Sequence, residues 1–137
     1  MAGWGPCPKV DAMEDFNIRD VQGRWFESRR YFSLNEMTLK CVKVDLLHGG
    51  GHGMMQMNTT AISLVTDKTV SIKGIKVRVA DAAEPGKLEL QFPSSEEWYK
   101  LWILGSDPHS WKVGYSCIDL KLIHLKYIWI WTRQQQP

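Results

Sequence analysis

The stretch Gly23-Arg24-Trp25-Phe26-Glu27 opens the first strand-like run of the chain, and Thr132-Arg133 closes the last one. A Trp side chain carries a large apolar area together with a polar N–H, so it suits the core of a fold or a ligand pocket. Two runs that lie so far apart in the sequence rarely carry such a matched Trp and Arg by accident. This pair is the strongest single indication of the fold.

Between these two stretches, strand-like runs recur at short spacing with turn signals between them. The alternation is clearest near residue 90, where Leu88, Leu90 and Phe92 share one face and polar residues share the other. The runs expected to form strands are residues 21–32, 39–47, 54–65, 70–79, 87–92, 98–104, 111–118 and 125–132. Eight short strands at regular spacing predict an all-β sandwich or barrel.

The tight hairpins favour an eight-stranded antiparallel up-and-down β-barrel, a size that can hold one small ligand. The alternative is an immunoglobulin-like sandwich, which usually has a Cys…Trp…Cys spacing and crossed connections. Cys41, Trp98 and Cys117 can be forced into that spacing. The order of the hairpins nevertheless indicates the barrel.

The length of 137 residues predicts a single domain over residues 1–137. We expect residues 1–20 to form an irregular lead-in with a helical turn at most, and residues 21–133 to form the barrel. Residues 48–53, with the sequence His-Gly-Gly-Gly-His-Gly, are expected to form a flexible hairpin loop. Its two histidines, His48 and His52, do not supply the three or four converging ligands that a metal needs, so no metal is expected.

The chain carries 17 basic and 15 acidic residues, well mixed along its length. This argues against nucleic-acid binding, which needs a clustered basic face. No stretch approaches the roughly 20 apolar residues of a membrane helix. The first residues show no charged leader followed by an apolar core, so we expect either a mature secreted N-terminus with an added Met or a fragment.

The ordered motifs of the chain resemble those of the lipocalins, and within them the branch that holds apolipoprotein D and the insect bilin-binding and Lazarillo-like proteins. The similarity runs through nearly the whole chain. Its motifs are Cys7-Pro8-Lys9-Val10, Gly23-Arg24-Trp25-Phe26-Glu27, Cys41, Glu84-Pro85-Gly86-Lys87-Leu88-Glu89-Leu90, Trp102-Ile103-Leu104 with Asp107, Tyr115-Ser116-Cys117 and Trp129-Ile130-Trp131-Thr132-Arg133. The family continues into a helix packed on the barrel wall, and this C-terminal helix is expected to be missing here.

The resemblance implies structural roles for several residues. Gly23, Trp25 and Arg133 form the family signature, in which Trp25 plugs the closed end of the barrel and Arg133 packs across its indole. Cys7 and Cys117 are implied to form a disulfide, with three reduced thiols in a cytosolic protein as the alternative. Cys41 is then expected to be unpaired and able to link a homodimer.

The same resemblance implies a small hydrophobic ligand inside the barrel, and alternation extends the set of lining residues. Glu27 and Arg29 share the parity of Trp25 and are expected to be the inward charges. The alternation also predicts Ile72 or Val77, Leu88 and Leu90 in this set. The ligand-binding residues predicted are Glu27, Arg29, Leu46, Met55, Met57, Phe92, Leu101, Ile103, Val113, Tyr115 and Trp129.

We therefore expect a secreted carrier of a fatty acid, bilin, retinoid or sterol, with no catalytic residues and no cofactor other than a bound lipid or bilin. Asn58-Thr59-Thr60 is an N-glycosylation sequon. No G-x-S-x-G, GxGxxG or P-loop motif is present. Two alternatives remain: an isomerase-type lipid enzyme on the same barrel, which needs a reactive Cys inside the cup, and an interaction protein that binds no ligand.

Overall fold

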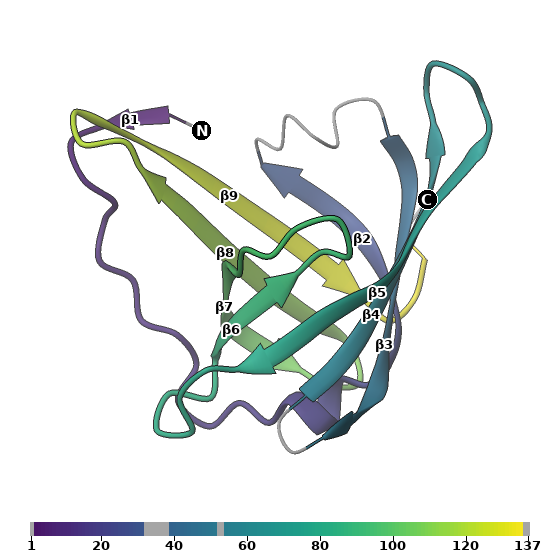
Figure 1. Cartoon of the computed structure of the whole chain (residues 1–137), viewed down its shortest axis with the longest axis horizontal. Coiled ribbons are helices and arrows are strands. Elements are labelled where there is room, and N and C mark those ends of the chain that lie inside the picture. The colour runs from purple at the N-terminus through teal and green to yellow at the C-terminus, as the bar shows by residue number, and fades with distance from the viewer. Residues whose placement is uncertain (1, 32–38, 52–53, 136–137) are drawn as a thin grey trace.

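The computed structural model describes residues 2–31, 39–51 and 54–135. Consecutive strands pair antiparallel from β2 to β9, and β9 pairs back with β2, so eight of the described strands close a barrel (Figure 1). The predicted all-β barrel is thus confirmed. Its strands are β2 (Gly23–Tyr31), β3 (Leu39–Gly51), β4 (Met54–Ser63), β5 (Thr69–Val79), β6 (Lys87–Gln91), β7 (Tyr99–Asp107), β8 (Trp111–Asp119) and β9 (Ile123–Thr132).

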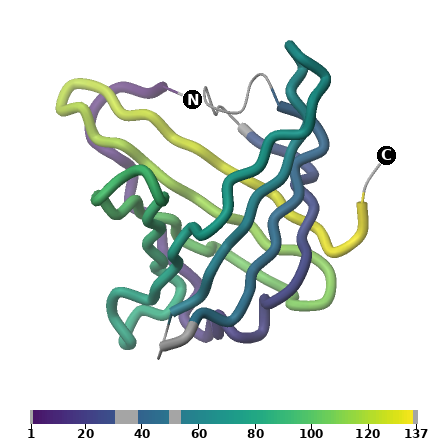
Figure 2. Tube along the Cα trace, turned by 45° about the vertical axis from the view of Figure 1, so that its right-hand side comes forward, coloured from purple at the N-terminus to yellow at the C-terminus, as the bar shows by residue number. Residues whose placement is uncertain are grey.

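Alternation along the strands sorts side chains between the inside and the outside of the barrel. On β6, Leu88 is buried in the core, while the outward Glu89 binds Arg78 of β5 at 2.8 Å. Adjacent residues of a strand point to opposite faces, so two consecutive residues supply a core side chain and one partner of a surface ion pair. The traces in Figure 2 show the same strands wrapping round until the first meets the last.

One end of the barrel is closed by a short 3₁₀ helix, η1 (Ile18–Val21), directly before β2. Ile18 and Val21 of this helix are buried in the core against Trp25, whose Nε1 donates to the Val21 carbonyl at 2.9 Å. The Asn17 side chain caps the helix by accepting from the backbone N–H of Arg19. The closed end therefore consists of a turn of helix sealed by an indole.

The lead-in is more ordered than the sequence predicted. Ala2–Trp4 form strand β1, which pairs with the beginning of β9. The helix η1 lies at the end of the expected lead-in, where a helical turn was allowed, and only its last residue, Val21, was expected to belong to the first barrel strand. The lead-in then runs down the outside of the barrel to η1 beneath it (Figure 1). Three residues with a Gly at the centre carried too little alternation to predict β1. Gly3 is needed because a Cβ there would meet the His124 ring at 2.6 Å.

The hairpin loop predicted at residues 48–53 is also partly wrong. His48, Gly49, Gly50 and Gly51 continue β3, with His48 opposite Met55 and a register irregularity before Gly51. His52 lies outside the described residues. Among the helices described, none is long and apolar enough to cross a membrane.

Candidate ligand-binding site inside the barrel

The floor of the barrel is formed by Trp25, which is completely buried, with the guanidinium of Arg133 lying 3.9 Å from its ring centroid. Arg133 is held there because its Nε donates to the Pro108 carbonyl at 2.8 Å and its Nη1 to the Arg24 carbonyl at 3.2 Å. Gly23 has a φ of 99°, and a Cβ there would lie 3.1 Å from Arg133. These contacts are the ones that the lipocalin resemblance implied for Gly23, Trp25 and Arg133.

A lysine that the sequence analysis missed lies against this floor. Lys112 on β8 is buried, and its Nζ lies 4.7 Å from the centroid of Trp25 and 4.9 Å from that of Trp131. Burial, and secondarily the nearby charge of Arg133, lower the pKa of Lys112 to about 7. A lysine that titrates near neutral pH within an aromatic environment is a candidate functional group.

One wall of the interior is a ladder of aromatic rings on β9. Tyr127 stacks on Trp129 with 5.9 Å between ring centroids, and Trp129 stacks on Trp131 at 6.1 Å. Trp131 is part of the buried core and Trp129 packs against it. Gly114 on β8 makes room for the ladder, since a Cβ there would lie 2.6 Å from the Trp131 ring. The inward face of β9 is therefore a continuous flat apolar surface.

Most of the aliphatic lining predicted from alternation does lie inward. Leu46, Met55, Leu101 and Ile103 are buried members of the core, and Met57 packs against it. Of the two alternatives Ile72 and Val77, Val77 belongs to the core and Ile72 is 47% exposed. The core also includes Leu88, and Leu90 packs against it. Phe92 follows β6 and packs edge-to-face on Tyr99 at 5.9 Å.

The inward placement predicted for Arg29 is wrong. A β-bulge between Glu27 and Arg29 shifts the register, so that Glu27 lies opposite Trp131 while Arg29 lies opposite Ile130 and is exposed. Arg30 takes the inward position opposite Trp129, where its Nη1 binds Glu27 at 3.3 Å and its Nη2 donates to the Leu39 carbonyl. Glu27 is inward as predicted, and its partner is Arg30.

The inward placement predicted for Val113 and Tyr115 is wrong too. Their neighbours Lys112 and Gly114 face inward, which turns Val113 and Tyr115 to the outer wall. Tyr115 lines a groove of about 240 Å³ with Cys7, Trp102 and Cys117. Burial there raises the pKa of Tyr115, and its hydroxyl has no hydrogen-bond partner among the described residues.

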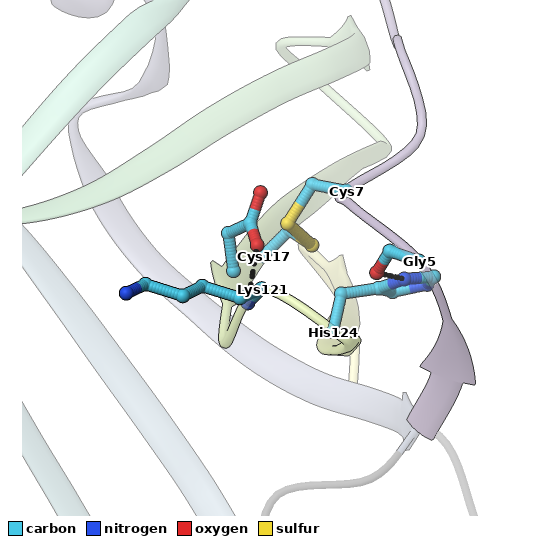
Figure 3. The surroundings of a disulfide bond; sticks show 6 residues. Gly5, Cys7, Cys117, Lys121 and His124 are labelled. Atoms are coloured by element: carbon cyan, nitrogen blue, oxygen red, sulfur yellow. Dashed lines mark hydrogen bonds between the residues drawn. A yellow bond between two sulfur atoms is a disulfide. The ribbon is translucent and has the colours of Figure 1, made fainter.

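The disulfide explains why this outer position is buried. Cys7 and Cys117 are bonded, with 6.2 Å between their Cα atoms, so the lead-in is clamped over the outer face of β8 (Figure 3). Nearby, His124 Nδ1 lies 3.1 Å from the Gly5 carbonyl. The implied disulfide is confirmed. It was also the signal that could have set the phase of β8, because an outward Cys117 requires an outward Tyr115.

The remaining candidates are mostly at the surface. Cys41 is a free, exposed thiol with a φ of 54°, and it lines a pocket of about 140 Å³ with Glu27 and Arg30. Asn58 is on β4, and its Oδ1 accepts from the Gly74 N–H at 2.9 Å beside a register shift, so it has a structural role of its own. His48 is exposed. Within residues 2–31, 39–51 and 54–135, no three His, Cys, Asp or Glu residues come together as a metal site.

Known proteins are similar to the chain in sequence and in architecture. The chain is 27% identical over 132 residues to apolipoprotein D of Rattus norvegicus, covering 94% of this chain and 67% of that protein. It is 26% identical over 120 residues to the Lazarillo protein of Schistocerca americana, covering 82% of this chain and 52% of that protein. The solved structure of insecticyanin from the tobacco hornworm Manduca sexta superposes with a TM-score of 0.87 at 20% identity, over 99% of this chain and 73% of that one.

The chain has the lipocalin fold, and its sequence is similar to that of apolipoprotein D. No protein-family model matches the chain. The sequence resemblance and the barrel agree with each other, because the signature residues lie where the fold needs them. Trp25 and Arg133 seal the closed end of the lipocalin barrel, and the disulfide ties its lead-in to the outer wall.

Proposed function

We propose that this protein is a lipocalin that binds and carries a small hydrophobic ligand inside its barrel. The observation that carries this proposal is the inward aromatic ladder of Tyr127, Trp129 and Trp131. Trp131 belongs to the same apolar core as the aliphatic side chains of Leu101 and Ile103. Ligand sites are lined mainly by apolar and aromatic side chains with few polar groups. The ligand-binding residues proposed are Glu27, Leu46, Met55, Met57, Phe92, Leu101, Ile103 and Trp129.

The ligand that fits this lining best is elongated, with an apolar tail and one acidic end. Its tail gains about 25 cal/mol for each Å² of apolar surface that it buries. Met55 and Met57 adapt to the shape of the tail because a thioether chain is flexible and polarisable. We rank long-chain fatty acids first, then bilins and retinoids, and then neutral sterols.

An extracellular setting accompanies this proposal. The Cys7–Cys117 disulfide needs an oxidising environment to persist, and such bonds are rare in cytosolic proteins. Glycosylation of Asn58 belongs to the same proposal, although Asn58 Oδ1 already accepts a backbone hydrogen bond. The proposed setting therefore rests chiefly on the disulfide.

The alternative function is an isomerase-type lipid enzyme on the same barrel, which would need a reactive Cys inside. Cys41 is the free cysteine, and its side chain is exposed. Cys41 is not among the side chains that pack in the core around the aromatic ladder. This observation favours the carrier over the enzyme.

Tryptophan quenching tests the proposal. Titration with retinoic acid, oleate, biliverdin and cholesterol should give at least one ligand with micromolar or tighter binding. Trp129→Phe should remove much of the quenching, because Trp129 lies in the ladder. Trp111→Phe is the matched control, since Trp111 is 43% exposed and should leave the quenching amplitude unchanged. Failure of all four ligands to bind, or equal effects of the two variants, would reject ligand binding in the barrel.

A further inference from the structure

Three hydrogen-bond donors lie in one row across adjacent strands at the floor of the barrel. Ser106 of β7 is the register partner of Lys112 on β8, and Lys112 is the register partner of Trp131 on β9. Side chains of paired residues point to the same face, and their Cβ atoms lie about 4.5–5.5 Å apart. Ser106 and Trp131 therefore flank Lys112 on the inner wall.

None of the three donors has a hydrogen-bond or ion-pair partner within the described part of the chain. Ser106 Oγ and Trp131 Nε1 are buried without any hydrogen bond. Lys112 forms none of the salt bridges found among the described residues, and its Nζ lies instead over the rings of Trp25 and Trp131. Buried polar groups are nearly always hydrogen-bonded, so each unsatisfied one calls for an explanation.

The chemistry of the row identifies what would satisfy it. An ammonium has three donors and no acceptor, an indole N–H donates only, and a hydroxyl can donate one proton. A carboxylate is the complement, because it only accepts, at two oxygens with about four lone-pair sites. A neutral ester or alcohol accepts less strongly and leaves the lysine charge without a counter-ion.

We propose that Lys112, Ser106 and Trp131 form a carboxylate site on the barrel floor, which binds the acidic end of the ligand and sets its orientation. This inference rests on the proposed function. The ligand enters acid end first, and its tail lies along Trp129 and Tyr127 towards the other end of the barrel. The carboxylate replaces the missing counter-ion of Lys112.

The charges around Lys112 support this assignment. Arg133 is a second basic side chain against the same indole, so the floor carries the charge of Arg133 together with that of Lys112 whenever Lys112 is protonated. The inward carboxylate of Glu27 lies two strands away in the same row, with Trp131 between it and Lys112, and binds Arg30 at 3.3 Å. Glu27 is therefore engaged elsewhere, and an incoming anion meets net positive charge at the floor.

A proton should be taken up when the carboxylate binds. Burial holds the pKa of Lys112 at about 7 in the free protein, and a bound anion restores the charged form. At pH 7 the free lysine is about half protonated, so binding takes up about half a proton per site. Uptake should disappear near pH 5, where Lys112 is already charged.

The experiment compares oleate, methyl oleate and oleyl alcohol by titration calorimetry in two buffers of different ionisation enthalpy. Lys112→Met should weaken oleate by about tenfold to a hundredfold, should abolish proton uptake, and should leave methyl oleate within about twofold. Lys76→Met is the matched control, because Lys76 is an exposed lysine of β5. Ser106→Ala should weaken oleate by a smaller factor, and it keeps the test available if the lysine variant fails to fold.

The outcomes separate the carboxylate site from the carrier function. Equal losses for oleate and its methyl ester in Lys112→Met, or oleate binding without proton uptake in the wild type, would overturn the carboxylate site and leave the carrier standing. Those results would mean that the three donors hold only water. Failure of all three lipids to bind would overturn both proposals.

Discussion

Both faces of β8 carry buried side chains, but the inner face is covered by the aromatic core and the outer face by the lead-in. On the inner face, Lys112 and Gly114 lie against the rings of Trp25 and Trp131. On the outer face, Tyr115 and Cys117 are covered by the lead-in that the disulfide clamps over them. Burial alone therefore does not identify a pocket residue in this barrel. The face on which a side chain lies decides whether it can touch a ligand or only stabilises the wall.

The largest effect expected is on the outer face, from removal of the disulfide. Cys7 and Cys117 are 110 residues apart, and opening a loop of that length costs about 4–5 kcal/mol in the chain-entropy model. The double variant Cys7→Ser/Cys117→Ser should lose that much in the free energy of unfolding measured with urea. Cys41→Ser is the control and should change stability by less than about 0.5 kcal/mol, because Cys41 is exposed. Similar stabilities of the two variants would show that the clamp contributes little.

The next effect is on the inner face and depends on pH. The pKa of Lys112 is about 7 in the folded protein, well below that of an exposed lysine, so the unfolded chain binds more protons between about pH 7 and 10.5. Lys112 therefore destabilises the fold fully below pH 7, and the penalty is relieved as the pH rises. Lys112→Met should raise the free energy of unfolding at pH 6 by a few kcal/mol and should gain much less at pH 10.

Chemical denaturation of both proteins at the two pH values measures this difference. A gain that is the same at pH 6 and pH 10 would mean that packing, not charge, distinguishes the variant. A loss of stability at pH 6 would mean that Lys112 has a counter-ion in the free protein, which contradicts the unpartnered floor.

A smaller effect follows from crowding the inner face. A Cβ at Gly114 would lie 2.6 Å from the Trp131 ring and 3.0 Å from Leu101 Cδ1, inside a packed core. Gly114→Ala should cost about 1–3 kcal/mol, as overpacked cores do. Gly105→Ala is the control, because its Cβ would meet only the ring of Trp111 at 3.1 Å, and that side chain is 43% exposed and can move. Thermal melts that rank Gly105→Ala as the more damaging change would reverse the assignment of the two faces.

The smallest effect separates Tyr115 from the ligand. Its hydroxyl is buried on the outer wall without a partner, so Tyr115→Phe removes an unsatisfied polar group. We expect the free energy of unfolding to rise by up to about 1 kcal/mol and the affinity for oleate to stay unchanged. A loss of affinity in this variant, measured by the same quenching titration, would place Tyr115 inside the barrel.

The strands, the closed end and the disulfide could be predicted because each depends on a residue pattern that indicates one structure. The Trp25–Arg133 pair and the Cys7–Cys117 bond followed from the resemblance, and alternation located the strands to within a few residues. These features need no knowledge of register between strands.

The sequence could not predict the charges inside the barrel, because alternation fixes two faces but not which one is inner. On β8 the apolar Val113 and Tyr115 appeared inward, yet the clamped lead-in gives the outer face an apolar cover as well. A lysine is normally read as a surface residue, so Lys112 was missed. A single extra residue in β2 exchanged Arg29 for Arg30, and a bulge of that kind leaves no mark in the pattern.

Binding of a lipid acid inside the barrel is tested most directly by a crystal structure of the protein in complex with oleate. We predict that the lipid lies inside the barrel, with its carboxylate within hydrogen-bond distance of Lys112 Nζ and its tail against Trp129 and Tyr127. Oleate found instead in the outer groove between Trp102 and Tyr115, or inside the barrel with its carboxylate at the opposite end from Trp25, would contradict the account.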